Sequence, residues 1–168
     1  MKRFSFADFI VDEGNREAVA VCQDIAELRP VSPQPVILLG EAGAGKTHLL
    51  YAIVNRVRSS YSAGDVKYAI LNPRKFPPEV RNQVESLIRD PGPVGRAKNA
   101  LLLVDQLEEF TEFLGELEAI IRVFLDAGHG VVIASAVHPE RLKGFPEGLR
   151  RLLEGGRLVT VAPRKAAV

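Results

Sequence analysis

A glycine-rich octapeptide carries the clearest chemical signal in the sequence. The pattern G-x-x-x-x-G-K-[ST] is matched in full by Gly40-Glu41-Ala42-Gly43-Ala44-Gly45-Lys46-Thr47. Glycines let the backbone curl so that successive N–H groups converge on an anion, and the positive end of a following helix dipole adds to the attraction. Lys46 would supply a cation for the outer phosphates of a nucleotide, and the Thr47 hydroxyl would coordinate its Mg²⁺. The spacing therefore predicts a phosphate loop that binds ATP or ADP with Mg²⁺.

A chance glycine-rich turn beside a surface lysine is the alternative reading of these residues. The octapeptide, however, follows an apolar run at 36–39 and opens a helical stretch at 47–57, which is where a phosphate loop must lie to work. Because pattern and flanking elements agree independently, we favour the phosphate loop.

A second element of the same site stands at the end of another apolar run. Residues 101–105 read Leu-Leu-Leu-Val-Asp, an apolar strand that ends in a carboxylate and resembles a Walker B strand. A carboxylate at the carboxyl edge of a parallel strand lies beside the phosphate loop and can hold Mg²⁺ through water. The weaker alternative is that Asp105 only caps the following helix, and the two roles are compatible. Thr47 and Asp105 are the predicted metal residues.

Hydrolysis needs a further group that orients or deprotonates water. Many such ATPases have an acid directly after the metal aspartate, but here the residue is Gln106. An amide can position water but is a poor base, so we expect slow or absent turnover unless Glu108 or Glu109 reaches the site. The reading we favour for both acids is that they lie in solvent at the start of a helix, where acids suit the dipole.

The elements that must position these residues alternate as strands and helices from about residue 15 onward, which is typical of a parallel sheet with crossover helices. Five short apolar runs show no polar alternation, so we predict strands that are buried on both faces. They are 36–39, 66–71, 100–104, 131–134 and 158–161. We expect one α/β domain over residues 1–168, a P-loop NTPase αβα sandwich with a five-stranded parallel sheet.

Helices are predicted at 15–28, 47–57 and 78–89, with an exposed loop at 90–95. A fourth helix is predicted from apolar residues that step by 3, 4, 3, 4 and 3 and form one continuous stripe: Leu107, Phe110, Leu114, Leu117, Ile121 and Phe124. The stripe could be a coiled-coil or partner surface. We favour burial, because a helix lying on a parallel sheet needs the same apolar face.

Composition limits the classes of protein that remain. The 168 residues are 46% hydrophobic, which suits one compact domain and excludes a disordered chain. Lys and Arg total 22 against 21 for Asp and Glu, so the net charge of +1 gives nucleic acid no bulk attraction. Cys22 is the single cysteine, and we read it as a small buried hydrophobe in a reducing compartment. No run approaches the roughly 20 apolar residues of a membrane span and no apolar signal core follows the N-terminus, so we expect a cytoplasmic protein without a membrane segment.

With these elements located, the chain resembles the AAA+ ATPase core of the DnaA and Hda family of bacterial replication initiators. The resemblance rests on residues 4–11 and 15–16, the phosphate loop with 46–50, the Walker B run 100–105, the sensor strand 132–135 and the segment 148–158. In that family the opening segment packs beside the adenine. The resemblance therefore implies nucleotide contacts from a further set of residues: Phe9, Ile10, Val11, Asn15 and His48. We expect His48 to pack or hydrogen-bond rather than catalyse.

Departures from the family pattern fall on the hydrolysis apparatus. The family's Walker B acid pair is Asp105 followed by Gln106 here, and its polar sensor residue falls on Ala136. Its arginine finger falls on Leu152, which leaves Arg150 or Arg151 as neighbours that could substitute. The resemblance thus implies a catalytic set of Asp105, Gln106 and one of these two arginines, in degraded form.

Only seven residues follow Val161, whereas the family continues into a helical lid and a DNA-binding helix-turn-helix domain. We therefore expect a core without lid or DNA-binding domain, weaker nucleotide binding, and no sequence-specific DNA recognition by a helix-turn-helix.

The leading functional hypothesis is a DnaA-related ATP-binding module that regulates replication initiation with weak or no hydrolysis. Its partner would be the replication initiator, another AAA+ protein or a second copy of the chain. The alternative is an active ATPase completed by oligomerisation or by an AAA+ partner, since arginine fingers act in trans. A less favoured third reading is a small-molecule phosphotransferase.

Overall fold

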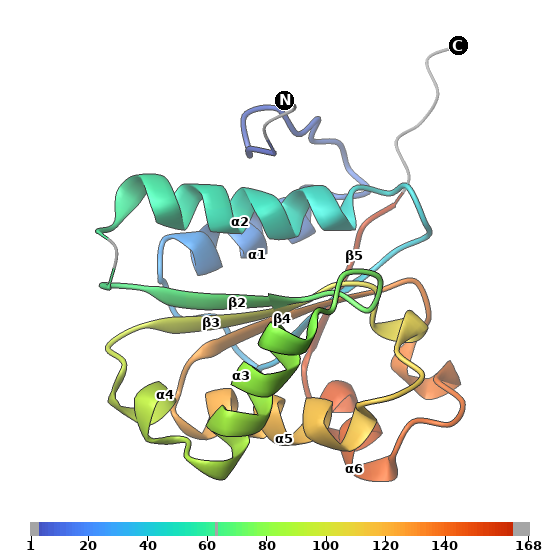
Figure 1. Ribbon diagram of the computed structural model, residues 1–168. Helices are drawn as coiled ribbons and strands as arrows, with labels where there is room; N and C mark the ends of the chain where they lie inside the picture. The colour runs from blue at the N-terminus through green and yellow to red at the C-terminus, as the bar shows by residue number, and fades with distance from the viewer. Residues whose placement is uncertain (1–3, 63, 163–168) are drawn as a thin grey trace.

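The computed structural model describes residues 4–62 and 64–162 and shows a parallel sheet between two layers of helices (Figure 1). The strands are β1 (Val36–Leu39), β2 (Lys67–Leu71), β3 (Ala100–Val104), β4 (Gly130–Ser135) and β5 (Arg157–Thr160). The helices are α1 (Arg16–Ala26), α2 (Lys46–Ser60), α3 (Pro78–Arg89), α4 (Gly92–Arg96), α5 (Leu114–Asp126) and α6 (Glu147–Glu154). Two short 3₁₀ turns are η1 (Leu107–Glu109) and η2 (Pro139–Arg141). The predicted fold class is confirmed: the sheet has five strands, all parallel.

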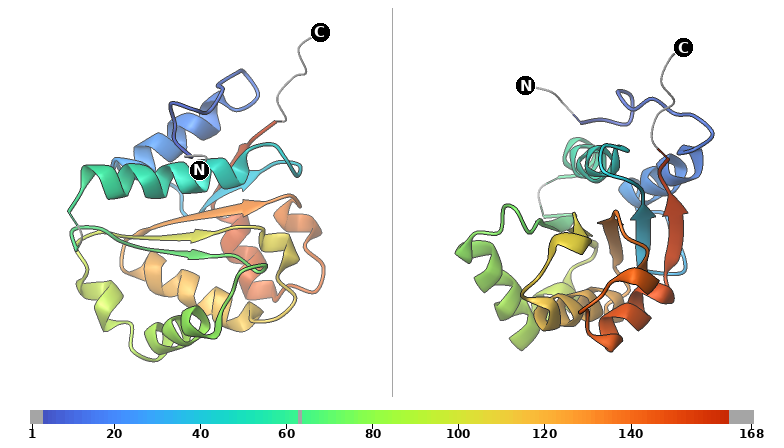
Figure 2. Two further views of the ribbon diagram at one scale, coloured as in Figure 1. Left: turned by 45° about the horizontal axis from the view of Figure 1, so that its top comes forward. Right: turned by 90° about the vertical axis from the view of Figure 1, so that its right-hand side faces the viewer.

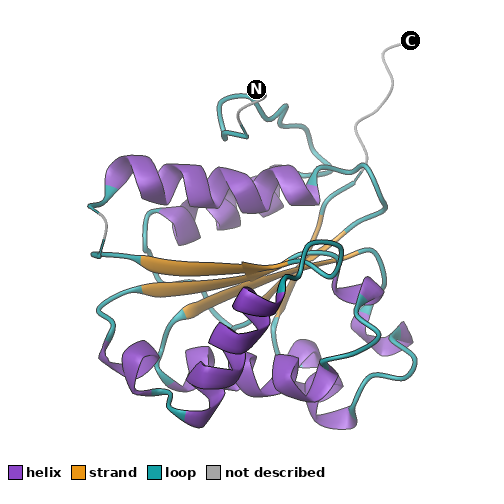
Figure 3. Cartoon of the chain, viewed as in Figure 1, coloured by secondary structure: helices purple, strands orange, loops and turns teal. Residues whose placement is uncertain are grey.

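The order of strands is β2-β3-β4-β1-β5, with α1 and α2 on one face and α3 to α6 on the other (Figures 1 and 2). Figure 3 shows the same sandwich by type of element. Successive side chains of a strand point to opposite faces, so Leu38 and Leu103 pack under α1 and α2, whereas Ile37 and Leu102 join the core on the other face. Because all strands run in one direction, the segments that follow β1, β3 and β4 meet at one edge of the sheet.

The prediction that all five strands are buried on both faces is wrong for β2 and β5. These strands lie at the two edges of the sheet. Tyr68 of β2 is 40% exposed and Leu158 of β5 is 42% exposed, whereas every residue of β3 is buried. An edge strand has a neighbour on one side only, so apolar residues there remain partly in water even without polar alternation.

The predicted continuous helix over the apolar stripe is also wrong, although its burial is confirmed. Gln106 and Phe113 adopt left-handed backbone at φ 50° and 67°, and α5 begins only at Leu114, so the stripe is split between η1 and α5. The stripe still lies in the core below the sheet, where Leu107, Leu117 and Ile121 are completely buried. Phe113 turns its ring onto Phe76, with ring centroids 4.9 Å apart. The apolar spacing therefore predicts the burial of these residues correctly, but it does not predict that the helix is interrupted.

The segment predicted as an exposed loop at 90–95 instead contains α4. Val94 is buried in the core below the sheet, and its carbonyl lies 2.8 Å from His129 Nε2. This apolar anchor orders a segment whose prolines and glycines suggested a loop.

Among residues 4–62 and 64–162, no helix is both long and apolar enough to cross a bilayer.

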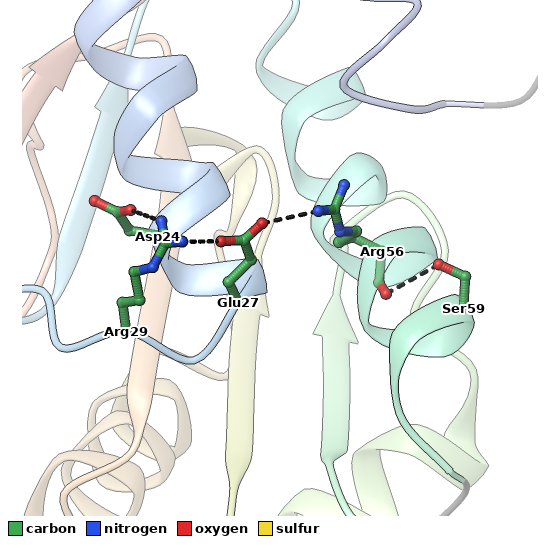
Figure 4. A network of polar contacts seen from close by, with 5 residues as sticks. All are labelled: Asp24, Glu27, Arg29, Arg56 and Ser59. Atoms are coloured by element: carbon green, nitrogen blue, oxygen red, sulfur yellow. Dashed lines mark hydrogen bonds and ion pairs between the residues drawn. The ribbon is translucent and has the colours of Figure 1, made fainter.

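The helices α1 and α2 lie side by side and share a small surface network of charges (Figure 4). Arg29 contacts Asp24 at 3.0 Å and Glu27 at 2.6 Å, and Glu27 also contacts Arg56 of α2 at 2.8 Å. Exposed ion pairs contribute at most about 1 kcal/mol each, so burial of apolar residues fixes this layer.

Cys22 is one of the buried residues of this layer. Its side chain is fully enclosed, and desolvation raises the pKa of the thiol to about 12. The reading of Cys22 as a buried hydrophobe is confirmed.

Candidate nucleotide-binding site

The phosphate loop links the interior strand β1, which lies between β4 and β5, to the start of α2, as its sequence predicts. Gly43 and Gly45 adopt φ of 84° and 105°, a backbone that L side chains rarely take. A Cβ atom at Gly45 would lie 2.7 Å from the ring of Phe9, and one at Gly40 would collide with the carbonyl of Val161. The loop thus needs glycine for both its curl and its packing. Such a curl in front of a helix is the backbone that binds an anion through its N–H groups.

Lys46 is the first residue of α2 and its side chain folds back over the loop. Its Nζ donates hydrogen bonds to the carbonyls of Gly40 and Glu41, the latter at 2.9 Å. The side chain is buried, and desolvation lowers the pKa of Lys46, while the nearby charges of Glu108 and Asp105 act in the opposite direction. An ammonium group has three donors, so a third can be given to a phosphate oxygen.

The structure brings the two predicted metal residues together from positions 58 apart in the chain. Thr47 Oγ1 donates to Asp105 Oδ2 at 2.8 Å, across the end of β4. Asp105 continues the pairing of β3 by donating its N–H to the carbonyl of Leu71 at 2.8 Å. Its side chain is buried, and desolvation raises the pKa of this carboxyl, opposed mainly by the hydrogen bonds from Thr47 and Gln106 N.

This donor set suits Mg²⁺. A hydroxyl and one carboxylate, with phosphate oxygens and water completing the shell, are the ligands that Mg²⁺ usually takes in nucleotide sites. Within the described residues no group of three or more His, Cys, Asp or Glu side chains forms a protein cage for a metal. The pair Thr47 and Asp105 therefore fits a cation that arrives with the nucleotide.

Gln106 directly follows the buried carboxylate and has two unusual features. Its backbone is left-handed at φ 50°, which is uncommon outside glycine and asparagine. Its side-chain Oε1 is buried and accepts no hydrogen bond from the described residues. A buried acceptor without a partner at the edge of a polar site suits a water molecule, and a role of the amide in orienting water stays a prediction.

Glu108 and Glu109 diverge, and the favoured expectation that both lie in solvent is wrong for Glu108. Glu108 is half-buried and its Oε1 accepts a hydrogen bond from Ala136 N at 2.9 Å. Its negative charge opposes the desolvation that lowers the pKa of Lys46 and adds to the desolvation that raises the pKa of Asp105. Glu109 is exposed and instead pairs with Arg74 at 3.0 Å. No signal in the sequence predicts that these two neighbouring acids have different surroundings. The difference arises from the turn of the backbone at Gln106.

The opening segment lies over the start of α2 (Figure 1). The ring of Phe9 touches Gly45 and meets His48 edge to face at 5.1 Å, and His48 Nε2 lies 2.7 Å from the carbonyl of Ser5. His48 therefore packs and hydrogen-bonds, as expected. Asn15 is buried and uses its amide within the segment, accepting from Asp12 N and donating to the carbonyl of Ile10.

Two apolar side chains of that segment remain in water. Ile10 is 51% exposed and Val11 is 44% exposed. Isolated exposed apolar residues are common, but two in a row on a segment that is tied to the phosphate loop can cover an aromatic base.

A family model described as the Bacterial DnaA ATPase domain matches residues 1–160. The chain belongs to the DnaA ATPase domain family. It is similar to the chromosomal replication initiator protein DnaA of Leifsonia xyli subsp. xyli, 29% identical over 163 residues that cover 95% of this chain and 34% of that protein. The DnaA of Chloroflexus aggregans is 30% identical over 164 residues, with 96% and 34% covered. The chain thus spans about a third of the length of these curated relatives.

Solved structures agree with this assignment. Domain III of DnaA from Thermotoga maritima superposes with a TM-score of 0.76 at 25% identity, covering 98% of this chain and 69% of that one. A replication initiator DnaA bound to AMPPCP and single-stranded DNA gives 0.73 at 26% identity, covering 96% and 50%. The fold and the relationship to replication initiation are therefore those of a DnaA-type ATPase domain.

The arginines proposed to replace the DnaA finger lie on α6. Arg150 donates to the carbonyl of Glu140 at 3.3 Å, and its buried Nε has no partner among the described residues. Arg151 is 75% exposed and pairs with Glu147 at 2.7 Å on the same helix. Within the described residues neither makes a hydrogen bond or ion pair to the phosphate loop of its own chain.

Proposed function

We propose that this DnaA-type domain binds ATP and ADP with Mg²⁺ at the loop after β1 and acts in the cytoplasm as a nucleotide-dependent interaction module or regulator of replication initiation, with slow hydrolysis of its own. The observation that carries the proposal is the 2.8 Å hydrogen bond between Thr47 and Asp105, because it joins the phosphate loop to the metal carboxylate. A DnaA of similar fold is bound to AMPPCP, a triphosphate analogue.

Each part of the nucleotide has a counterpart in the chain. Backbone N–H groups of the loop and the Lys46 ammonium suit the phosphates, while Thr47 and Asp105 suit Mg²⁺. Phe9 is held against Gly45, and the exposed Ile10 and Val11 offer apolar surface for a base. The polar groups are held in place by the fold itself, which lowers the ordering cost of binding.

The proposed partner is the replication initiator, another AAA+ protein or a second copy of this chain. Bound nucleotide would favour one arrangement of the loop and of the opening segment, and a ligand shifts a protein toward whichever state it binds better. The exposed guanidinium of Arg151 favours a second candidate, an ATPase completed by assembly, because a finger must reach the nucleotide of a neighbour.

A titration with a fluorescent ATP analogue, with and without Mg²⁺, tests the proposal. We expect Lys46→Ala to weaken ATP binding by about 100-fold, since it removes the cation nearest the phosphates. Lys67→Ala is the matched control, because Lys67 is an exposed lysine at the start of edge strand β2 and its loss should leave affinity unchanged. Absence of wild-type binding at millimolar nucleotide would overturn the proposal.

A further inference from the structure

We infer that Glu108 is the general base of this chain, taking over the task of the acid that is replaced by Gln106. This inference rests on the proposed function, because it requires a bound triphosphate beside the phosphate loop.

The path of the chain after β3 delivers Glu108 to the site. Asp105 ends the strand, Gln106 turns the backbone at φ 50°, and the single turn η1 carries Glu108 back over the edge of the sheet. Its Oε1 accepts the hydrogen bond from Ala136 N at 2.9 Å, at the carboxyl end of β4. The residue before Ala136 is Ser135, whose carbonyl accepts from Gly40 N, the first residue of the phosphate loop, at 3.2 Å. Glu108 is thereby tied to the strand next to the loop.

The charge of Glu108 agrees with the position that its hydrogen bond to Ala136 gives it. The charge of Glu108 acts on Lys46, the cation intended for the outer phosphates, and on Asp105, the metal carboxylate. Within the described residues Glu108 forms no ion pair, so no cation neutralises its carboxylate directly. Glu109 is neutralised by Arg74 at 3.0 Å.

The other polar groups at this edge are less suited to accept a proton. Asp105 has one carboxylate oxygen engaged by Thr47 and the other by Gln106 N. The amide of Gln106 can orient water through its unpartnered Oε1 but is not basic. Glu108 has Oε1 fixed by Ala136, and its Oε2 makes no hydrogen bond to the described residues. Glu108 therefore combines a fixed position with an available basic oxygen.

The proposed step is hydrolysis of the terminal phosphate. The oxygen of water forms a bond to the γ-phosphorus while the bond from that phosphorus to the β,γ-bridging oxygen breaks, and ADP leaves with the electron pair. Glu108 Oε2 takes a proton from the attacking water and later releases it to solvent, and inorganic phosphate is the second product. A positioned general base contributes about 10²- to 10⁴-fold to such a rate.

Two measurements on the full chain test this role: single-turnover hydrolysis of γ-labelled ATP, and the affinities for fluorescent ATP and ADP analogues. Glu108→Gln keeps an oxygen for the hydrogen bond from Ala136 but removes the base. We expect its hydrolysis to fall about 100-fold. We also expect its preference for ATP over ADP to rise about threefold, since a negative charge facing the terminal phosphate is removed. Glu109→Gln is the matched control and should change neither value by more than about twofold.

The outcomes separate the two proposals. Wild-type protein that binds no nucleotide overturns the proposed function. Wild-type protein that binds ATP without hydrolysing it, or Glu108→Gln protein that keeps its rate and its ATP preference, overturns the role of Glu108 alone. If Glu108→Gln loses its thermal transition, Glu108→Asp carries the same test: a shorter carboxylate should cost about 10-fold in rate with ATP affinity retained. An unchanged rate in that variant overturns the inference.

Discussion

The loop after β1 and the segment after β3 reach the same edge of the sheet, but only the first contains within itself everything that its task requires. Residues 40–47 bring the glycines, the lysine and the threonine in one stretch, because backbone N–H groups contribute most of the phosphate contacts. The segment 105–109 has its carboxylate in place, but Gln106 stands where the resemblance to the DnaA family leads one to expect an acid, and Glu108 comes from the next turn. Binding is thus encoded locally, whereas hydrolysis depends on where a turn directs its side chains.

The largest expected effect comes from a substitution in the phosphate loop, the region whose function is encoded locally. Gly45→Ala adds a Cβ atom at a residue with φ of 105°, 2.7 Å from the ring of Phe9. We expect ATP affinity to fall about 100-fold and stability by about 2 kcal/mol, because both the loop and the opening segment must shift. Nucleotide titration and thermal melting give the two values. Gly115→Ala is the control: a Cβ there meets nothing within 4 Å, so affinity should stay the same. An affinity loss common to both variants would contradict the argument.

The fold and the loop were predictable because their signals are short in range. Each strand is an apolar run that the helices must cover, and the phosphate loop lies between one such run and a helix. The errors came from residues whose role depends on distant contacts. Nothing local marks Phe113 as the left-handed residue that interrupts the stripe, since its conformation is held by packing on Phe76. Neighbouring side chains on a 3₁₀ turn point about 120° apart. The turn at Gln106 and the hydrogen bond from Ala136 therefore place Glu108 at the site, and the sequence marks neither of them.

The next effect concerns the metal carboxylate that joins the two regions. Asp105→Asn keeps a partner for the Thr47 hydroxyl but removes the charge, and desolvation already disfavours that charge, so the fold should remain intact. We expect the gain in ATP affinity that Mg²⁺ gives the wild-type chain to fall by about tenfold. Titrations with Mg²⁺ and with EDTA measure the gain. Asp126→Asn, at the exposed end of α5, is the control and should keep the full gain in ATP affinity from Mg²⁺. If this variant also loses the gain, the effect of Asp105→Asn comes from the change in net charge and not from a lost metal ligand.

A smaller effect should come from the strained residue of the second region. Gln106→Gly relieves a left-handed backbone and removes a buried oxygen without a partner among the described residues. Strain relief of about 1–2 kcal/mol outweighs the greater freedom of glycine in the unfolded chain, so we expect a net gain of about 1 kcal/mol. Thermal melting should rise by about 2–4 °C.

The same substitution at Gln83, an exposed position inside α3, is the control for Gln106→Gly. Glycine there should lower stability by about 1 kcal/mol, because it replaces a good helix former. Destabilisation of both variants by equal amounts would mean that Gln106 is not strained, and the turn would then owe its direction to other contacts.

The smallest effect tests whether the ion pair next to Glu108 helps to aim that side chain. Arg74→Ala breaks the contact with Glu109, and Arg74 is 70% exposed, so the loss in stability should stay below about 0.5 kcal/mol. Hydrolysis should also stay within about twofold of wild type, because Glu108 is held by Ala136 and the backbone of Gln106 rather than by its neighbour. Melting and single-turnover assays at low and high salt check both values. A tenfold slower reaction with unchanged ATP affinity would show instead that η1 needs its outer ion pair to hold Glu108 toward the loop, and the two acids would then act as one unit.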